Sequence, residues 1–406
     1  MAHWEIQGWM ILILGWVFVP FYTRSMVYTM PEFLERRYNP QSRTILSVIS
    51  LVSYVLTKVA VTVYAGGLVF QQVFGIKELW GIDFFWIAAI GLVVLTALYT
   101  IFGGMKSVLY TSVLQTPILL LGSLIILVLG FKELGGWDEM MRVCGAVTVN
   151  DYGDTMTNLI RSNDDANFPW LGALIGSAII GFWYWCTDQF IVQRVLSGKN
   201  EMEARRGTIF GAYLKLLPVF LFLIPGMIAF ALHQKYIGAG GEGFLPMLEN
   251  GTANADAAFP TLVAKLLHAG VKGLVVCGIL AALMSSLASL FNSSAMLFTI
   301  DFYKRFRPQT SEKKLVGIGQ VATVVIVILG ILWIPIMRSV GDVLYTYLQD
   351  VQSVLAPGIA AAFLLGICWK RTSAQGGMWG LISGMVIGLT RLGAKVYYSN
   401  AGEVAD

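Results

Sequence analysis

Residues with side-chain oxygens gather in the middle of one apolar stretch, 273–306. They are Ser285, Ser286, Ser289, Asn292, Ser293 and Ser294. Ser285, Ser289 and Asn292 are spaced three and four residues apart, so a helix would place them on one face. Such a face is typical of close helix packing, for which small residues are common. A site where oxygen ligands bind a small hard cation is the alternative. The spacing leaves both alternatives open.

Polar side chains also occur deep in other apolar stretches. Lys215 lies about two turns inside its segment, and a lysine at such a depth indicates a functional site. Lys58 has apolar and hydroxyl neighbours on both sides, a position from which its ammonium could still snorkel to the interface. The run GFWYWCTDQF at 181–190 is typical either of an interfacial aromatic belt or of a wall that stacks on sugar rings. Gln349, beside two tyrosines, offers a similar combination of an amide with aromatic faces.

The composition shows which elements must position these residues. The chain has 406 residues, of which 56% are hydrophobic and 13% charged, and its mean hydropathy is +0.70. These values exclude an ordinary soluble enzyme and predict an all-α polytopic membrane protein. The net charge of +4 comes from basic loops, so no nucleic-acid partner is expected. No nucleotide-binding motif, nucleophile–base set or metal-ligand cluster is visible, so no enzyme is predicted.

Ten segments are long and apolar enough to cross a bilayer. They are 4–22, 45–74, 84–102, 108–131, 170–188, 209–232, 273–303, 315–337, 351–369 and 377–396. Basic residues concentrate in alternate loops, and the positive-inside rule places these loops in the cytoplasm. The acidic loop 132–168 and both ends of the chain are therefore expected outside.

Several runs together resemble the sodium/solute symporter family, and within it the sodium/glucose cotransporter-like members. The strongest are WYWCTDQFIVQR at 183–194, YLK at 213–215 and AALMSSLASLFNSS at 281–294. The resemblance extends over nearly the whole chain. It implies the leucine-transporter (LeuT) fold, with two inverted five-helix repeats and alternating access. It also implies one transmembrane transporter domain over 1–406, a plasma (inner) membrane location, and no obligate protein partner.

The resemblance implies that the coupling ion is sodium. The family's sodium site matches the backbone carbonyl of Ala282 and the hydroxyls of Ser285 and Ser286. This match favours the cation-binding alternative for the hydroxyl-rich stretch. Many members have Thr-Asp where this chain has Thr111 and Ser112, a difference that removes a carboxylate near the ion path.

The resemblance also implies a solute site. The positions that contact sugar in galactose- and glucose-type members match Glu5, Lys215 and Gln349. The gating positions match aromatic residues, which are Tyr184 for the inner gate and Trp4 with Tyr345 for the outer gate. Solute and sodium ion are thus the expected small-molecule partners.

The chain departs from the family at the solute site and at its ends. Gly8 and Gly181 stand where members have a serine and an asparagine. The first core helix should precede Trp4 and is missing, so the domain is expected to be incomplete at its N-terminus. The chain also ends short of the extra C-terminal helices of many members.

The leading hypothesis is sodium-coupled symport of a small solute by alternating access, and a sugar is the favoured solute. The same machinery with sialic acid, myo-inositol, proline or pantothenate is an alternative, as is a non-transporting membrane sensor or fragment.

Overall fold

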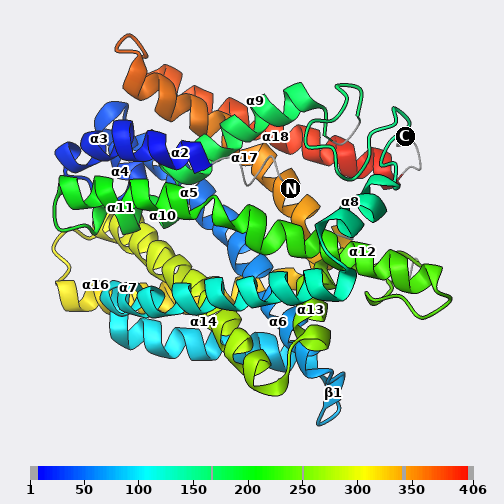
Figure 1. Cartoon of the computed structure of the whole chain (residues 1–406). Coiled ribbons are helices and arrows are strands. Elements are labelled where there is room, and N and C mark those ends of the chain that lie inside the picture. The colour runs from blue at the N-terminus through cyan, green and yellow to red at the C-terminus, as the bar shows by residue number, and fades with distance from the viewer. Residues whose placement is uncertain (1–7, 166–167, 249–250, 341–343, 401–406) are drawn as a thin grey trace. The chain divides into compact units, whose positions relative to one another are not determined.

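The structure is a computed structural model that describes residues 8–165, 168–248, 251–340 and 344–400. These residues are mostly helical (Figure 1). Helices are expected from such apolar segments, because a helix satisfies its own backbone hydrogen bonds without water. The chain divides into two compact units, each assembled from separate stretches. The single domain over 1–406 therefore stays a prediction.

The first unit contains Val61–Trp170 and Leu216–Ser289. It takes in nearly all of α6 (Ala60–Phe74) and most of α14 (Ala269–Met296). Its other elements are β1 (Glu78–Leu79), β2 (Ile82–Asp83), α7 (Phe84–Leu134), α8 (Trp137–Gly145), η4 (Val219–Leu223), α12 (Ile224–Gly238), η5 (Ala255–Ala257) and α13 (Ala258–Leu266). The two strands form a small antiparallel hairpin in which Glu78 pairs with Asp83.

The core of the first unit is built around α12. Ile228 and Leu232 are fully buried and belong to one apolar cluster with Ile126 of α7 and Leu262 of α13. The acidic loop 132–168, which the charge bias predicts outside, begins beside the end of α12, since the Lys235 ammonium donates to the Leu134 carbonyl over 3.1 Å.

The acidic loop after α8 is held by its own polar side chains. Asn150 and the backbone N–H of Ser162 donate hydrogen bonds to the Asp154 carboxylate, at 2.9 Å and 2.7 Å. Together these hydrogen bonds lower the pKa of Asp154, with the Asn150 side chain as the largest cause.

The second unit contains Ile6–Ala60, Leu171–Lys215 and Leu290–Asp406. Its N-terminal elements are α2 (Gly8–Ile13), η1 (Leu14–Phe18), α3 (Val19–Ser25), α4 (Met30–Arg37), α5 (Pro40–Ser53) and η2 (Tyr54–Val59). The middle stretch forms α9 (Trp170–Gly181), η3 (Phe182–Thr187), α10 (Gln189–Leu196) and α11 (Glu201–Leu214). The last stretch forms η6 (Leu297–Tyr303), α15 (Lys304–Phe306), α16 (Glu312–Val340), α17 (Leu344–Cys368) and α18 (Ala374–Asn400).

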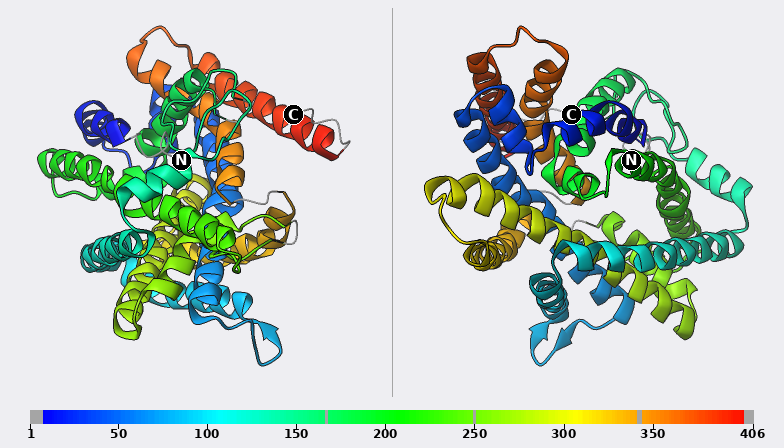
Figure 2. Two further views of the ribbon diagram at one scale, coloured as in Figure 1. Left: turned by 45° about the vertical axis from the view of Figure 1, so that its right-hand side comes forward. Right: turned by 90° about the vertical axis from the view of Figure 1, so that its left-hand side faces the viewer.

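Aromatic side chains dominate the core of the second unit. The rings of Phe33 and Phe363 stack with centroids 5.8 Å apart, and the buried Tyr22 hydroxyl donates to the Cys186 carbonyl over 2.8 Å. Helices α17 and α18 lie side by side (Figures 1 and 2). Gly358 and Gly384 permit this approach, since a Cβ at Gly384 would lie 2.5 Å from the Gly358 Cα.

The basic loops predicted in the cytoplasm meet at one end of the second unit. The Arg37 guanidinium donates to the carbonyl of Trp369 over 3.0 Å, and Arg305 donates to the Thr44 hydroxyl over 2.6 Å. Three separate basic loops are thus joined by hydrogen bonds, as a shared side of the membrane requires.

Seven helices of the described residues are long and apolar enough to cross a membrane. An eighth span results if Gly8–Ser25 and Met30–Arg37, which meet at a bend of 75°, count as one. Phe84–Thr100 is a shorter apolar helix, and α18 does not pass the same test of length and composition. Helices occur at all ten predicted segments, but the predicted count of ten spans is not confirmed.

Five π-helical segments interrupt the described helices, at η1, η2, η3, η4 and η6. Such segments shift backbone hydrogen bonds by one residue and are frequent at functional sites. Lys58 lies in η2, Tyr184 in η3 and Asp301 in η6.

Candidate functional site

Part of the hydroxyl-rich stretch of α14 lies in the first unit, where Ser285 and Ser289 are both buried. Ser285 is 8% exposed, and its hydroxyl oxygen lies 2.6 Å from that of Ser112 on α7. The Ser289 hydroxyl donates to the Ser285 carbonyl over 3.0 Å. At the residue directly before Ser285, the Tyr99 hydroxyl donates to the carbonyl of Met284 over 2.9 Å. Side-chain and backbone oxygens from two helices therefore lie close together in an apolar setting.

Two more of the predicted ligands lie on this helix. Ala282 and Ser286 are both partly buried, and Ser286 directly follows Ser285. The donor set consists of neutral hydroxyl and carbonyl oxygens, and no cluster of three His, Cys, Asp or Glu side chains exists among the described residues. Neutral oxygens suit a hard monovalent cation better than a transition metal. The oxygens of Ala282, Ser285 and Ser286 are therefore chemically suited to bind a sodium ion.

Lys215 and Tyr184 are linked through Trp185. Lys215 caps the C-terminus of α11, and its ammonium nitrogen lies 5.7 Å from the centre of the Trp185 ring. The rings of Trp185 and Tyr184 meet edge to face, with centroids 5.0 Å apart. A cation over an indole face is a favourable contact. This aromatic run therefore lies against the predicted solute-site lysine instead of forming only an interfacial belt.

Gln349 contributes a buried amide on α17, which packs against η3. Its Nε2 atom has no hydrogen-bond partner among the described residues, and the same holds for Trp185 Nε1 and Gln352 Oε1. A buried polar atom without a partner costs about 1–3 kcal/mol. Three such atoms on two packed elements indicate that a polar molecule completes their hydrogen bonds.

Three predicted residues cannot be placed. Trp4 and Glu5 lie outside the described residues. Tyr345 belongs to α17, but its side chain is not among those described.

A buried ion pair lies close to Tyr184. The ammonium of Lys58 contacts the carboxylate of Asp188, and these side chains are 8% and 3% exposed. The Tyr54 hydroxyl donates to Asp188 over 2.6 Å. The Lys58 nitrogen also lies 4.8 Å from the ring centre of Tyr184 and 4.6 Å from that of Phe190. Lys58 therefore does not snorkel to the interface, because a carboxylate and aromatic faces hold it inside the unit.

The family is decided by comparison with known proteins. The model of the Sodium:solute symporter family matches residues 2–384. The chain belongs to this family. Its members are transporters, which confirms the predictions that the chain is a multi-pass membrane protein and not an enzyme.

Several relatives of this symporter-family chain are named cotransporters. Sodium/myo-inositol cotransporter 2 of Homo sapiens is 38% identical over 404 residues, which are 96% of this chain and 59% of that protein. The sodium/mannose cotransporter of Bos taurus is 39% identical over 402 residues, covering 95% and 65% of the two chains. This chain thus spans about three fifths of the length of such relatives.

A solved structure shares the fold. The chain superposes with a TM-score of 0.74 on a Na+-coupled sialic acid symporter in a substrate-bound outward-open state, over 95% of this chain and 82% of that one. At 21% identity this likeness speaks for the fold alone. The prediction of an all-α membrane protein of the LeuT type is confirmed.

A second polar cluster of this symporter-family chain surrounds Asp301 on η6. Its side chain is fully buried and accepts hydrogen bonds from Thr29 (2.9 Å), Ser47 (3.0 Å) and the Arg43 Nε (2.8 Å). Arg43 also pairs with Glu35 over 2.5 Å. The cluster therefore fastens η6 to α4 and α5. Sequence patterns did not predict the pairing of Arg43 with Asp301, because the two residues are 258 positions apart.

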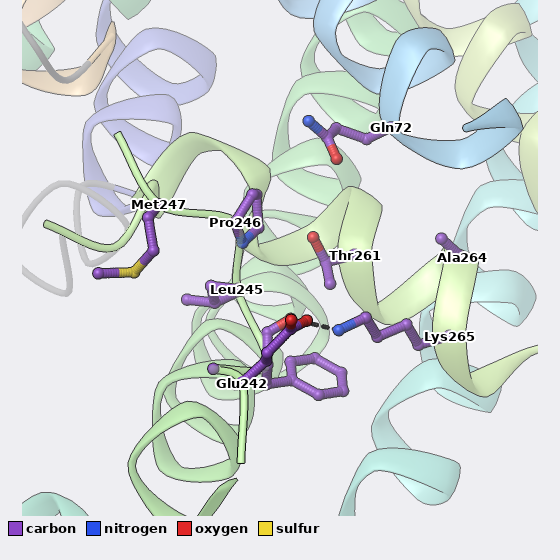
Figure 3. Close-up of a pocket in the computed structure, with 10 residues that line it drawn as sticks. Gln72, Glu242, Leu245, Pro246, Met247, Thr261, Ala264 and Lys265 are labelled. Carbon is purple, nitrogen blue, oxygen red and sulfur yellow. Dashed lines mark hydrogen bonds between the residues drawn. The ribbon is translucent and has the colours of Figure 1, made fainter. Parts of the chain in front are cut away.

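A pocket of about 510 Å³ lies in the loop region of the first unit, between α13 and the segment 242–247 (Figure 3). Its lysine, Lys265, donates to the Phe244 carbonyl over 2.7 Å and lies 4.7 Å from the centre of that ring. Lys265 carries the one ammonium among the described residues that line the pocket, and it already holds the loop, so this pocket is not assigned to the solute.

Proposed function

We propose that this chain carries out sodium-coupled symport of a small polyhydroxylated solute across the plasma membrane. Family membership supports the transport class, and the names of the relatives support a sugar or inositol. The observation that carries the proposal is the pair of polar sites described above. One offers only neutral oxygens, and the other offers a cation, an aromatic wall and buried amides without partners.

Sodium is assigned to α14. Ala282 offers its carbonyl, and Ser285 and Ser286 offer hydroxyls, as the family resemblance implies. We add the Ser112 hydroxyl, because it already lies within hydrogen-bond distance of Ser285. Because these ligands are all neutral, the bound ion itself would carry the net charge of the site.

The solute is assigned to Lys215, Gln349 and Tyr184, with Glu5 as a fourth contact and Trp4 and Tyr345 as the outer gate. An ammonium donates hydrogen bonds and an amide both donates and accepts, which suits hydroxyl groups. Tyr184 would cover the apolar face of the ring, as the inner gate. Glu5 disfavours an anionic solute, so a neutral polyol is favoured over sialic acid.

Uptake into proteoliposomes tests the proposal. The whole chain is reconstituted, and labelled myo-inositol, mannose, glucose and sialic acid are offered with a sodium or a potassium gradient. We expect accumulation of at least one neutral polyol that requires sodium. Accumulation of sialic acid alone would favour the carboxylated alternative. If neither uptake nor solute binding depends on sodium, the symporter assignment is wrong for this chain.

Ser285→Ala and Ser286→Ala test the ion ligands. Each replacement keeps nearly the same volume and removes one oxygen, so the sodium concentration for half-maximal uptake should rise about tenfold, since interactions with charged groups are worth about 1.5–3 kcal/mol. Ser383→Ala, on an exposed part of α18, is the control and should leave sodium dependence unchanged. If sodium dependence is unaltered in both variants, Ser285 and Ser286 do not bind the ion, and this face of α14 serves helix packing instead.

Gly8→Ser tests where the solute site ends. A Cβ at Gly8 would lie 3.4 Å from the Ala212 carbonyl oxygen and 3.5 Å from Lys215 Cγ, both ordinary contacts. We therefore expect a folded protein with a new hydroxyl beside Lys215. One added hydrogen bond to the solute should strengthen the apparent solute affinity about fivefold. Gly211→Ser, where a Cβ meets nothing within 4 Å, is the matched control. Equal affinities for both variants and the parent chain would place Gly8 outside the site.

A further inference from the structure

An apolar groove of about 450 Å³ runs along the outside of the second unit. Its walls come from α5 and η2 on one side and from α16 on the other, and Phe298 of η6 also lines it. Every residue that lines it is apolar. Val321 and Val325 are 64% and 49% exposed, so the groove opens outward.

The α16 wall is one continuous helix face. Its residues recur at steps of three and four, which are Ile318, Val321, Ala322, Val325, Ile326 and Leu329. From first to last they extend about 16 Å along the helix at 1.5 Å per residue. That length is close to half of the roughly 30 Å hydrocarbon thickness of a bilayer. The groove therefore has the depth of a single leaflet.

Two exposed cations, Lys314 and Arg305, stand near one end of the groove. Lys314 precedes Ile318 by four residues, so it begins the same face of α16, and it is exposed. On the opposite wall, Arg305 donates to the Thr44 hydroxyl over 2.6 Å and to the Pro40 carbonyl over 3.2 Å. These contacts hold the guanidinium at the start of α5, about two turns from the groove residue Leu51.

We propose that the groove holds an acyl chain of an anionic phospholipid from the cytoplasmic leaflet, with its phosphate between Arg305 and Lys314. The apolar lining fits a hydrocarbon chain, and its length fits one leaflet. The two basic residues stand where the headgroup of that lipid would lie. Arginine is suited to phosphate because its planar donors match two oxygens at once.

The lipid would contact η2, a segment that also makes contacts inside the second unit. Val55 and Leu56 line the groove and belong to η2, the π segment that also carries Lys58. The Leu56 carbonyl accepts a hydrogen bond from Tyr347 of α17 over 2.8 Å. A ligand that binds only the folded state stabilises it by mass action, so this lipid should raise the thermal stability of the protein.

Lipid titration of the purified, delipidated chain in detergent tests the proposal, with neither sodium nor solute present. Binding is followed by native mass spectrometry and by the midpoint of thermal unfolding. We expect dioleoyl phosphatidylglycerol to bind and stabilise, and phosphatidylcholine to bind at least tenfold more weakly. Glycerol phosphate, which has the headgroup without the chains, should not compete. Competition by glycerol phosphate would mean a free-phosphate site, and equal binding of both lipids would mean no headgroup selection, so either result overturns the proposal.

Paired variants separate the two halves of the site. Arg305→Gln with Lys314→Gln should weaken phosphatidylglycerol binding about twenty-five-fold, at about fivefold per cation. Lys199→Gln with Arg206→Gln removes two other exposed cations and should change it less than twofold. Val325→Trp fills the groove and should abolish stabilisation, whereas Val324→Trp changes an equally exposed neighbour outside the lining. If the two double variants bind phosphatidylglycerol equally well, or if the two tryptophan variants are stabilised equally, the lipid does not bind in this groove. Because the assay needs no transport, its failure is independent of the proposed function.

Discussion

Replacing Lys58 with methionine is expected to destabilise the protein by about 3–5 kcal/mol, because it leaves a buried carboxylate without its cation. The Lys58 and Asp188 side chains are at most 8% exposed, so water cannot replace the lost partner. Methionine keeps most of the stem that packs among the rings of Tyr54, Tyr184 and Phe190. The measurement is the midpoint of thermal unfolding in detergent, together with the yield of monodisperse protein.

The double variant Lys58→Met with Asp188→Asn is the control for this prediction. Asparagine keeps the side-chain oxygen that caps α10 and accepts from Tyr54, but it carries no charge. Since the penalty in the single variant comes from the unpaired charge, the double variant should recover most of the stability. A single variant as stable as the parent chain would show that Asp188 is not buried as described. A double variant that is no better than the single one would assign the effect to packing.

Lys215→Ala is expected to weaken apparent solute affinity by ten- to a hundredfold, because a hydrogen bond from a charged donor is worth about 1.5–3 kcal/mol. The ammonium lies over Trp185 at 5.7 Å, next to Tyr184, and would donate to solute hydroxyls. The measurement is solute concentration dependence of uptake at saturating sodium. The half-maximal sodium concentration, measured separately, should move much less, since the proposed sodium ligands lie on α14.

Lys235→Ala is the matched control for Lys215→Ala. It removes a lysine whose ammonium also has a described partner, the Leu134 carbonyl, but which belongs to no proposed site. Solute affinity should be unchanged in this variant. If Lys215→Ala leaves affinity within twofold of the parent chain while uptake stays sodium-dependent, the solute site must be sought elsewhere.

Helical periodicity predicted the buried face of α14 correctly. Ser285 and Ser289 are 8% and 1% exposed, because a spacing of three and four fixes their angular position wherever the helix is placed. The same rule does not identify what the face meets. Ser112, whose hydroxyl lies 2.6 Å from Ser285, is 173 positions away and looked only like a departure from the family pattern.

Lys58 shows why the interior charges were missed. Its neighbours in sequence offered no carboxylate, so snorkelling was the simplest interpretation. The partner, Asp188, is 130 positions away, at the point where η3 ends and α10 begins. Local patterns identify which residues are buried, but long-range pairing depends on how the helices pack. The bend of 75° after Ser25 and the π segments were also beyond sequence patterns, because neither has a distinctive composition.

The π segments give their helices a means of turning without unfolding. A π turn holds one residue more than an α turn of the same hydrogen-bonded backbone. If such a turn reverts to α geometry, every residue beyond it advances by one register step, a rotation of about 100° and a shift of about 1.5 Å. Backbone hydrogen bonds are exchanged in that step, so its cost is on the order of one of them, about 1 kcal/mol. Lys58, Tyr184 and Asp301 each lie on such a segment, so the side chains that hold the second unit together stand where a helix can rotate most cheaply.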